Sequence, residues 1–244
     1  VDDAYFVKYV VEECYKAKAR SVMVEWSCDE ITKLHYKHQS LKTLTEIPKW
    51  KLEKLQLAVD RLPAMIHILS EDPDAMNGVD QEKMTQVRRT TGPTFMKYRE
   101  QMENKYQWTI VGIPGEAWAQ KIFPNVSKKK AMELLWDAIL EVTRVYGDPI
   151  KNWEAHNANI SDKCEKLNAL GIKTLRYKSA NGTDFNVGLH KESIFAGGIE
   201  KTLSGVVFNP NMPTEECFTS PDKTTANGVV MATKPLSVMG SVVS

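Results

Sequence analysis

The stretch Tyr106-Gln-Trp-Thr-Ile-Val-Gly112 decides the fold class, because this apolar run stands between two segments with the pattern of helices. Large apolar and β-branched residues in a run this short predict a strand. Residues 64–70 form a similar near-continuous apolar run, which is typical of a strand covered on both faces. Residues 21–26 predict another strand. Strands that alternate with helices in this way indicate a parallel sheet with right-handed crossovers.

The intervening segments predict the flanking helices. Ser127 is a good N-cap, and Ala131, Leu135 and Ile139 begin an apolar stripe with the period of a helix. Gly147-Asp-Pro149 then separates this helix from the next, which we expect to end at Gly171. The other expected helices are residues 2–17, 29–38, 41–60 with a break near Pro48, 80–104 with a break at Gly92-Pro93, and 114–120.

The pattern changes after Gly171. Asn181-Gly182 between two short apolar segments is a strong hairpin signal, and the remainder is rich in Gly, Asn and Thr. We therefore expect an α/β domain over residues 1–171, with a mostly parallel sheet and flanking helices, and a β-rich segment over 172–244. The chain ends within the strand-like run 238–243, so we expect it to be part of a longer polypeptide.

Composition excludes several function classes. The 244 residues are 42% hydrophobic and 26% charged, which suits a soluble protein with a sizeable core. The net charge of +1 gives no reason to expect nucleic acid or an anionic membrane as a partner. The four cysteines are scattered without a C-x-x-C pair, which argues against a zinc ribbon or a disulfide framework and favours a cytoplasmic location.

The most informative stretch for function is Asn211-Met-Pro-Thr-Glu-Glu-Cys-Phe-Thr-Ser-Pro221, which places two adjacent acids between two prolines. Proline restricts its own backbone and that of the preceding residue, so the loop is braced on both sides. Adjacent carboxylates favour a divalent metal bound through oxygen. In extended backbone Glu215 and Glu216 point to opposite sides, so at most one would be a direct ligand. A solvated acidic turn is the alternative.

Several stretches together resemble the M29 family of metallo-aminopeptidases, the thermophilic aminopeptidase T and S type. They are Pro213-Thr-Glu-Glu-Cys-Phe-Thr-Ser-Pro-Asp222, Asn227-Gly228, Thr233-Lys-Pro-Leu236, Trp108-Thr-Ile-Val-Gly-Ile-Pro114, Ala117-Trp-Ala-Gln-Lys-Ile-Phe-Pro124, Leu135-Trp-Asp-Ala-Ile139, Thr143-Arg144, Trp153-Glu-Ala-His156 and Gly182-Thr-Asp184. The family usually has Val where Cys217 stands, a difference that should not affect a metal.

The resemblance implies a metal-dependent aminopeptidase with two divalent ions, either zinc, cobalt or manganese. It also implies that the β-rich segment over 172–244 begins the metal-dependent peptidase domain, which is truncated here. It implies that Glu216 is a metal ligand, while Glu215 is a candidate general base or a residue that braces the loop. The family's remaining ligands, a second Glu, two His, a Tyr and an Asp, have no counterpart before Ser244. We therefore expect these 244 residues alone to be inactive, and we expect peptide substrates and a homodimer for the full-length enzyme.

Other candidates carry weaker signals. His35 and His38 have a spacing that could place both on one metal, but a surface or interface role is favoured. We expect His67 to be a hydrogen-bonded core histidine, His156 to serve in packing or between domains, and His190 to be a loop residue. Asp184 could look catalytic, but turn chemistry is the simpler explanation. Cys217 could be a thiol nucleophile, but the motif has no His partner for it. Arg88-Arg89 is a small basic spot that is more often solvated than functional.

Two rival functions remain open at this point. The chain could be a stand-alone α/β module for binding or assembly, in which the acidic motif serves only the fold. It could also bind a nucleotide, but Gly112-Ile-Pro-Gly115 lacks both the G-x-G-x-x-G and the Gly-Lys-Ser/Thr patterns. The acidic motif and the resemblance therefore favour the peptidase.

Overall fold

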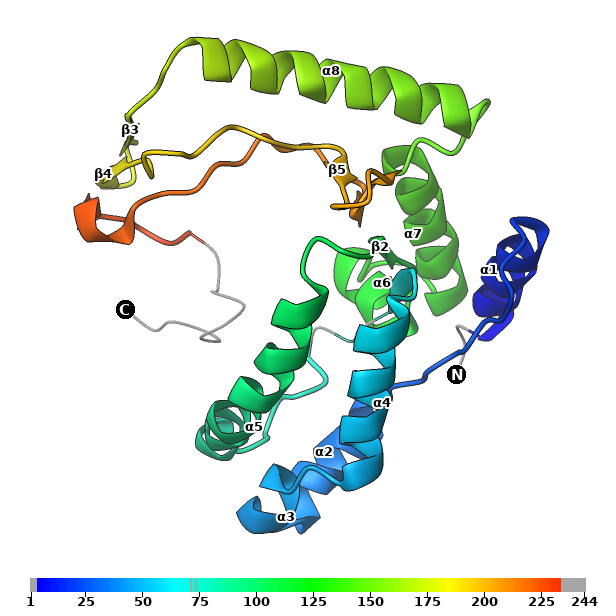
Figure 1. Cartoon of the computed structure of the whole chain (residues 1–244). Helices are drawn as coiled ribbons and strands as arrows, with labels where there is room; N and C mark the ends of the chain where they lie inside the picture. The colour runs from blue at the N-terminus through cyan, green and yellow to red at the C-terminus, as the bar shows by residue number, and fades with distance from the viewer. Residues whose placement is uncertain (1–3, 71, 73, 234–244) are drawn as a thin grey trace. The chain divides into compact units, whose positions relative to one another are not determined.

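The computed structural model describes residues 4–70, 72 and 74–233 (Figure 1). Contacts divide the chain into two compact units. The first unit comprises Val1–Pro149 and Ile199–Pro213, and the second comprises Ile150–Gly198 and Thr214–Ser244. The chain thus leaves the first unit after Pro149, returns to it for Ile199–Pro213 and leaves it again at Thr214. The boundary expected at residue 171 lies within the second unit, and the division into residues 1–171 and 172–244 stays a prediction.

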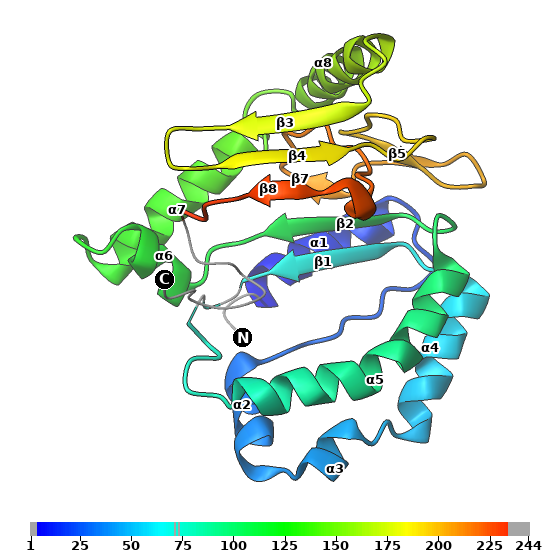
Figure 2. The ribbon, with the colours of Figure 1, turned by 90° about the vertical axis from the view of Figure 1, so that its left-hand side faces the viewer.

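The first unit contains the expected parallel sheet. Strand β1 (Met65–Leu69) pairs with β2 (Trp108–Gly112), which pairs with β7 (Asn211–Met212), and both pairings are parallel. Figure 2 shows β1 and β2 running side by side. In the register, Met65 lies opposite Trp108 and Ile110 lies opposite Asn211. A mixed α/β architecture with a parallel sheet is therefore confirmed, although this sheet is small.

The best-buried core of the first unit lies between α6 (Glu116–Ile122) and α7 (Lys128–Val142). Its fully or nearly buried residues are Ala119, Ala131, Leu135 and Ile139, with Trp118, Phe123 and Met132 packed against them. The apolar stripe predicted for α7 therefore faces α6. The Ser127 side chain accepts a hydrogen bond from the amide of Lys130 (3.3 Å), which confirms the predicted N-cap.

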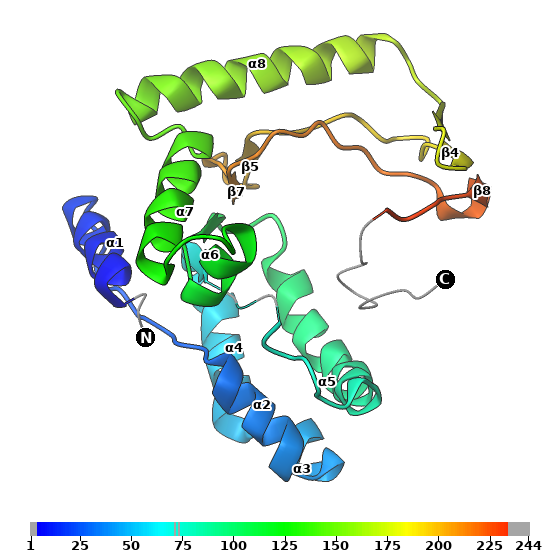
Figure 3. The same cartoon turned by 180° about the vertical axis from the view of Figure 1, so that it is seen from behind.

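Helix α1 (Ala4–Lys16) lies beside α7, as Figure 3 shows. The ring of Phe6 contacts that of Trp136 with centroids 5.6 Å apart, a tilted aromatic pair. Residues 2 and 3, expected to cap this helix, lie outside the described residues.

Four further helices belong to the first unit: α2 (Asp29–His38), α3 (Leu41–Thr45), α4 (Lys49–Arg61) and α5 (Gln81–Met102). Helix α5 contacts α3 and α4. The Lys83 ammonium on α5 donates to the carbonyl oxygens of Tyr36 and Gln39, both at 2.6 Å, and so satisfies acceptors at the end of α2. The predicted break at Pro48 is confirmed, since α4 begins directly after it.

The predicted break of α5 at Gly92-Pro93 is wrong, because the helix continues through Pro93. A proline removes only one helical amide, and α5 is long enough to keep its hydrogen bonds on both sides. The predicted strand over residues 21–26 is also wrong, since this segment forms no ladder. Its Met23 and Trp26 are exposed, and apolar composition alone does not supply a pairing partner.

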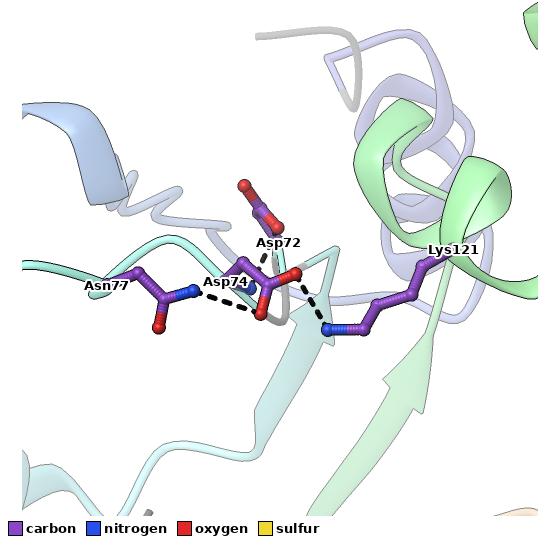
Figure 4. Close-up of polar contacts among 4 residues, drawn as sticks. All are labelled: Asp72, Asp74, Asn77 and Lys121. Atoms are coloured by element: carbon purple, nitrogen blue, oxygen red, sulfur yellow. Dashed lines mark hydrogen bonds and ion pairs between the residues drawn. The ribbon is translucent and has the colours of Figure 1, made fainter.

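An ion pair ties the loop after β1 to α6. The Lys121 ammonium lies 2.7 Å from the Asp74 carboxylate, which also accepts from the side chain of Asn77 at 3.2 Å (Figure 4). The Asp74 amide in turn donates to the Asp72 carboxylate at 2.9 Å. The hydrogen bond from Lys121 lowers the pKa of Asp74, so the pair stays ionised in neutral solution. The two charged side chains are about half exposed.

The second unit is built on α8 (Pro149–Ala169) and an antiparallel sheet. Strand β4 (Asp184–Gly188) lies between β3 (Thr174–Lys178) and β8 (Asn227–Val229), as Figure 2 shows. The hairpin predicted at Asn181-Gly182 is confirmed, with Gly182 at φ +98°. The 3₁₀ helix η1 (Lys223–Thr225) precedes β8.

The remaining strands, β5 (Glu200–Lys201) and β6 (Val207–Phe208), pair with each other in the first unit. The expectation that residues 172–244 begin a metal-dependent peptidase domain stays a prediction. The strand-like run 238–243 lies outside the described residues. Among the residues that the structure describes, none of the helices has the length and apolar character needed to cross a membrane.

Candidate functional site around the acidic motif

The segment that carries the two glutamates runs antiparallel to residues 189–197 within the second unit. Ala196 and Phe218 exchange two backbone hydrogen bonds of 2.9 and 2.8 Å. Further along, the His190 amide donates to the Ser220 carbonyl at 3.0 Å, and Leu189 forms a bridge with Pro221. The acidic motif is therefore a backbone-paired extended segment. Its braced character was predicted from the prolines, but its pairing was not.

Helix α8 holds the beginning of this segment. His156 is buried, and its Nε2 lies 2.6 Å from the carbonyl oxygen of Thr214, which is also buried. A carbonyl oxygen only accepts hydrogen bonds, so Nε2 carries the proton and donates. The His156 ring also meets the ring of Trp153 edge-on, with centroids 5.7 Å apart. The expected packing role of His156 is therefore joined by a specific polar contact with the motif.

The two glutamates follow directly after this contact. The Glu215 carboxylate has one oxygen 3.9 Å from Nε2 of His156 and is 62% exposed. The Glu216 side chain is also exposed. The backbone of Glu216 is closely packed, because a Cβ atom added to Gly197 would overlap its carbonyl oxygen and lie 3.1 Å from Cγ2 of Ile160. Glu216 thus combines an accessible carboxylate with a tightly packed backbone.

Two thiols interact at the motif, Cys217 within it and Cys164 on α8. The Sγ of Cys217 is 4.0 Å from the carbonyl oxygen of Ile160, one helical turn before Cys164 on α8. Burial, and then a hydrogen bond with Cys217, raises the pKa of the Cys164 thiol to about 11. A thiol with a raised pKa is a poor nucleophile, so Cys164 is suited to packing and not to covalent catalysis.

Metal-binding capacity is limited in the part of the chain that the structure describes. Within it, no three His, Cys, Asp or Glu side chains come close enough together to hold a metal ion. Nε2 of His156 is occupied by the Thr214 carbonyl and is not available as a ligand. The Thr219 hydroxyl is buried without a hydrogen-bond partner. Glu216 offers an exposed carboxylate, and the described residues alone do not complete a metal site.

The other histidines do not join the motif. His35 on α2 makes a side-chain contact of 3.0 Å with Gln39, the residue after this helix, and His38 ends the helix. No metal group forms there among the residues described. The expectation that His67 lies in a buried core is wrong, because its side chain is exposed on β1. Strand β1 has β2 on one side, and the expected neighbouring strand at 21–26 is absent from the described ladders.

The remaining candidates also have structural roles. His190 is an exposed loop residue whose amide pairs with Ser220. Asp184 opens β4 and lies 3.4 Å from Arg176 and 3.7 Å from Lys178, which is consistent with turn and strand chemistry. Gly112–Gly115 connects β2 to α6, and a Cβ at Gly115 would contact Ser70 Oγ at 2.9 Å, so this glycine permits close packing.

Sequence reasoning missed two residues, one in each unit. Burial raises the pKa of the Glu200 carboxyl on β5, which no pattern in the sequence indicates. Gly197 was not singled out, although the Gly197-Gly198 pair is a visible signal for close backbone approach. To predict the environment of either residue, one must know which segments become neighbours in the fold.

Comparisons with known proteins support the resemblance to the M29 family. The family model described as thermophilic metalloprotease (M29) matches residues 1–244. Aminopeptidase AmpS of Bacillus subtilis is 35% identical over 240 residues, which covers 98% of this chain and 58% of that protein. Aminopeptidase T of Thermus thermophilus is 32% identical over 240 residues, which covers 98% of this chain and 59% of that protein.

The fold is shared with a solved structure as well. Wild-type AmpT from Thermus thermophilus superimposes with a TM-score of 0.84 at 31% identity, over 97% of this chain and 58% of that one. The chain therefore spans less than two thirds of the length of the relatives it matches.

Proposed function

The chain belongs to the M29 family of thermophilic metalloproteases, and from that premise we propose that its full-length protein is a metal-dependent aminopeptidase that releases N-terminal residues from peptides. The observation that carries the proposal is the Glu215-Glu216 pair on a backbone fixed from two sides. The printed names of the relatives, AmpS and aminopeptidase T among them, support the same activity.

Glu216 is the proposed metal ligand. Its carboxylate is exposed while its backbone is held by close packing with Gly197, so little freedom is lost when a cation binds. Because the described residues bring no three potential ligands together, the other ligands would have to come from parts of the full-length protein beyond them. Two ions of zinc, cobalt or manganese are proposed on family grounds.

A bound divalent metal would supply Lewis-acid polarisation of the peptide carbonyl and a water of lowered pKa. The contribution of this chain is to hold the carboxylate of Glu216 in place. Glu215 is the candidate general base, with a carboxylate that is 62% exposed and a neighbour in His156 at 3.9 Å. Bracing of the loop is the alternative role for Glu215.

Peptide substrates, a homodimer and a cytoplasmic location complete the proposal for the full-length protein. The four free cysteines support a reducing compartment. The competing function is a non-catalytic binding or assembly module, which the incomplete ligand set within the described residues favours. The two functions differ in whether Glu216 is needed for metal binding.

The test is Glu216→Gln in the full-length protein, with zinc content and release of an N-terminal residue measured together. We expect both to be lost, because the amide is a weak metal ligand and carries no charge. The matched control is Glu192→Gln, an exposed glutamate of the same unit, which should change neither. Full metal content with normal turnover in Glu216→Gln would refute the ligand role. A folded wild-type protein that binds no zinc and releases no residue would favour the binding module.

A further inference from the structure

His156 contacts the acidic motif at its first residue. Its Nε2 donates a hydrogen bond of 2.6 Å to the carbonyl oxygen of Thr214, and the peptide unit of that carbonyl joins Thr214 to Glu215. Both partners are buried, with exposed fractions of 9% for His156 and 7% for Thr214. A buried hydrogen bond of this kind resists rotation of the peptide plane, since the freed carbonyl would have no water to bond.

The segment is also fixed after the glutamates. The carbonyl of Glu216 packs against Gly197, and Phe218 exchanges two backbone hydrogen bonds with Ala196. The backbone from Thr214 to Phe218 is therefore held at its beginning by a side chain of α8 and at its end by a neighbouring strand-like segment. The contact at the beginning depends on a single side chain, that of His156.

We infer that His156 is a positioning residue, which fixes the Thr214–Glu215 peptide plane and thereby the direction in which the Glu216 carboxylate leaves the backbone. This inference rests on the proposed role of Glu216 as a metal ligand. His156 itself touches neither substrate nor metal in this account. Its ring is kept in place by the edge-on contact with Trp153, so the donor points at the carbonyl.

The test compares two substitutions in the full-length protein. His156→Leu keeps an apolar side chain of similar bulk but removes the donor. His156→Gln retains an amide Nε2–H that can reach the Thr214 carbonyl. His190→Leu is the matched control, because His190 is exposed in the same unit and makes no side-chain bond to the motif. Zinc affinity is measured by competition with a chelator, and amide hydrogen exchange is followed at Phe218.

We expect His156→Leu to weaken zinc binding by about tenfold or more, in the range seen when a group that orients a ligand is removed. The amide of Phe218 should exchange faster, and kcat should fall while KM changes little. His156→Gln should restore zinc affinity to within about threefold of the wild type, because the donor is restored. His190→Leu should match the wild type in each measurement.

A folded His156→Leu variant with unchanged zinc affinity and unchanged exchange at Phe218 would overturn the inference. If His156→Leu does not fold, His156→Gln decides: wild-type affinity supports the hydrogen bond, and affinity lowered tenfold in a folded His156→Gln variant contradicts it. Failure of the proposed function would look different, since the wild type would then bind no zinc and release no residue. Exchange at Phe218 in the variants would still decide whether His156 holds the segment.

Discussion

Gly197→Ala is the sharpest structural prediction for the acidic motif. The new Cβ would overlap the carbonyl oxygen of Glu216 and lie 3.1 Å from Cγ2 of Ile160. The first of these neighbours is backbone, so no change of rotamer can relieve the overlap. The motif segment would have to move away from residues 196 and 197, which opposes the backbone pairing of Ala196 with Phe218.

The magnitude follows from two contributions. Inserting a methyl group into a well-packed site costs about 1–3 kcal/mol of unfolding free energy. Loss of one of the two hydrogen bonds between Ala196 and Phe218 would add about 1 kcal/mol. We therefore expect Gly197→Ala to lower the free energy of unfolding of the second unit by about 2–4 kcal/mol.

The assay is urea unfolding combined with hydrogen exchange of peptides that cover residues 190–220. Gly112→Ala is the matched control, because a Cβ there meets only the Trp118 ring at an ordinary 3.5 Å. That variant should be neutral or more stable by up to about 1 kcal/mol, since alanine restricts the unfolded chain. Equal stability and equal exchange protection for Gly197→Ala and Gly112→Ala would refute the close approach of Glu216 and Gly197.

Three further predictions concern single residues. Burial raises the pKa of Glu200, so ionisation of this carboxyl opposes folding as the pH rises through its pKa in the folded state. Glu200→Gln should therefore raise the melting temperature more at pH 7 than at pH 4. An equal increase at both pH values would contradict this. The pKa of Cys164 is raised from 9.0 to about 11, so its thiolate fraction and its alkylation rate at pH 8 should be about 100-fold lower than for an ordinary thiol. Alkylation of Cys164 as fast as that of Cys28 would exclude the raised pKa. Ser127→Ala should lower the free energy of unfolding by about 1 kcal/mol, because the N-cap of α7 is lost. Ser127→Asp should keep the cap and the stability, as measured by urea titration. Equal stability of the two variants would show that the cap does not contribute.

Local patterns predicted much of the fold. The period of α7, the cap at Ser127 and the hairpin at Gly182 depend on neighbours in sequence, and all three are present. The segment 21–26 has strand-like composition but forms no ladder, because pairing depends on a partner that composition does not specify. Pro93 lies within α5 although proline is a helix-breaking signal, because it removes only one helical amide and the helix continues on both sides.

The same contrast between local patterns and contacts of distant segments holds for the candidate site. Adjacent acids between prolines were sufficient to single out Glu215 and Glu216. The contact between His156 and Thr214 spans 58 positions, and the packing of Gly197 on Glu216 joins two separate segments. Neither follows from spacing along the chain. Resemblance to a family implied a role for Glu216, which stays a prediction, and the structure describes how its backbone is held.

The central claim is tested most directly by incubating the full-length protein with one peptide in two forms, with a free and with an acetylated N-terminus, before and after removal of metal by a chelator. The account predicts release of the N-terminal residue from the free peptide only, loss of release with the chelator, and recovery when zinc, cobalt or manganese is returned. Release that persists without metal, equal cleavage of the acetylated peptide, or no cleavage of either form would contradict a metal-dependent aminopeptidase.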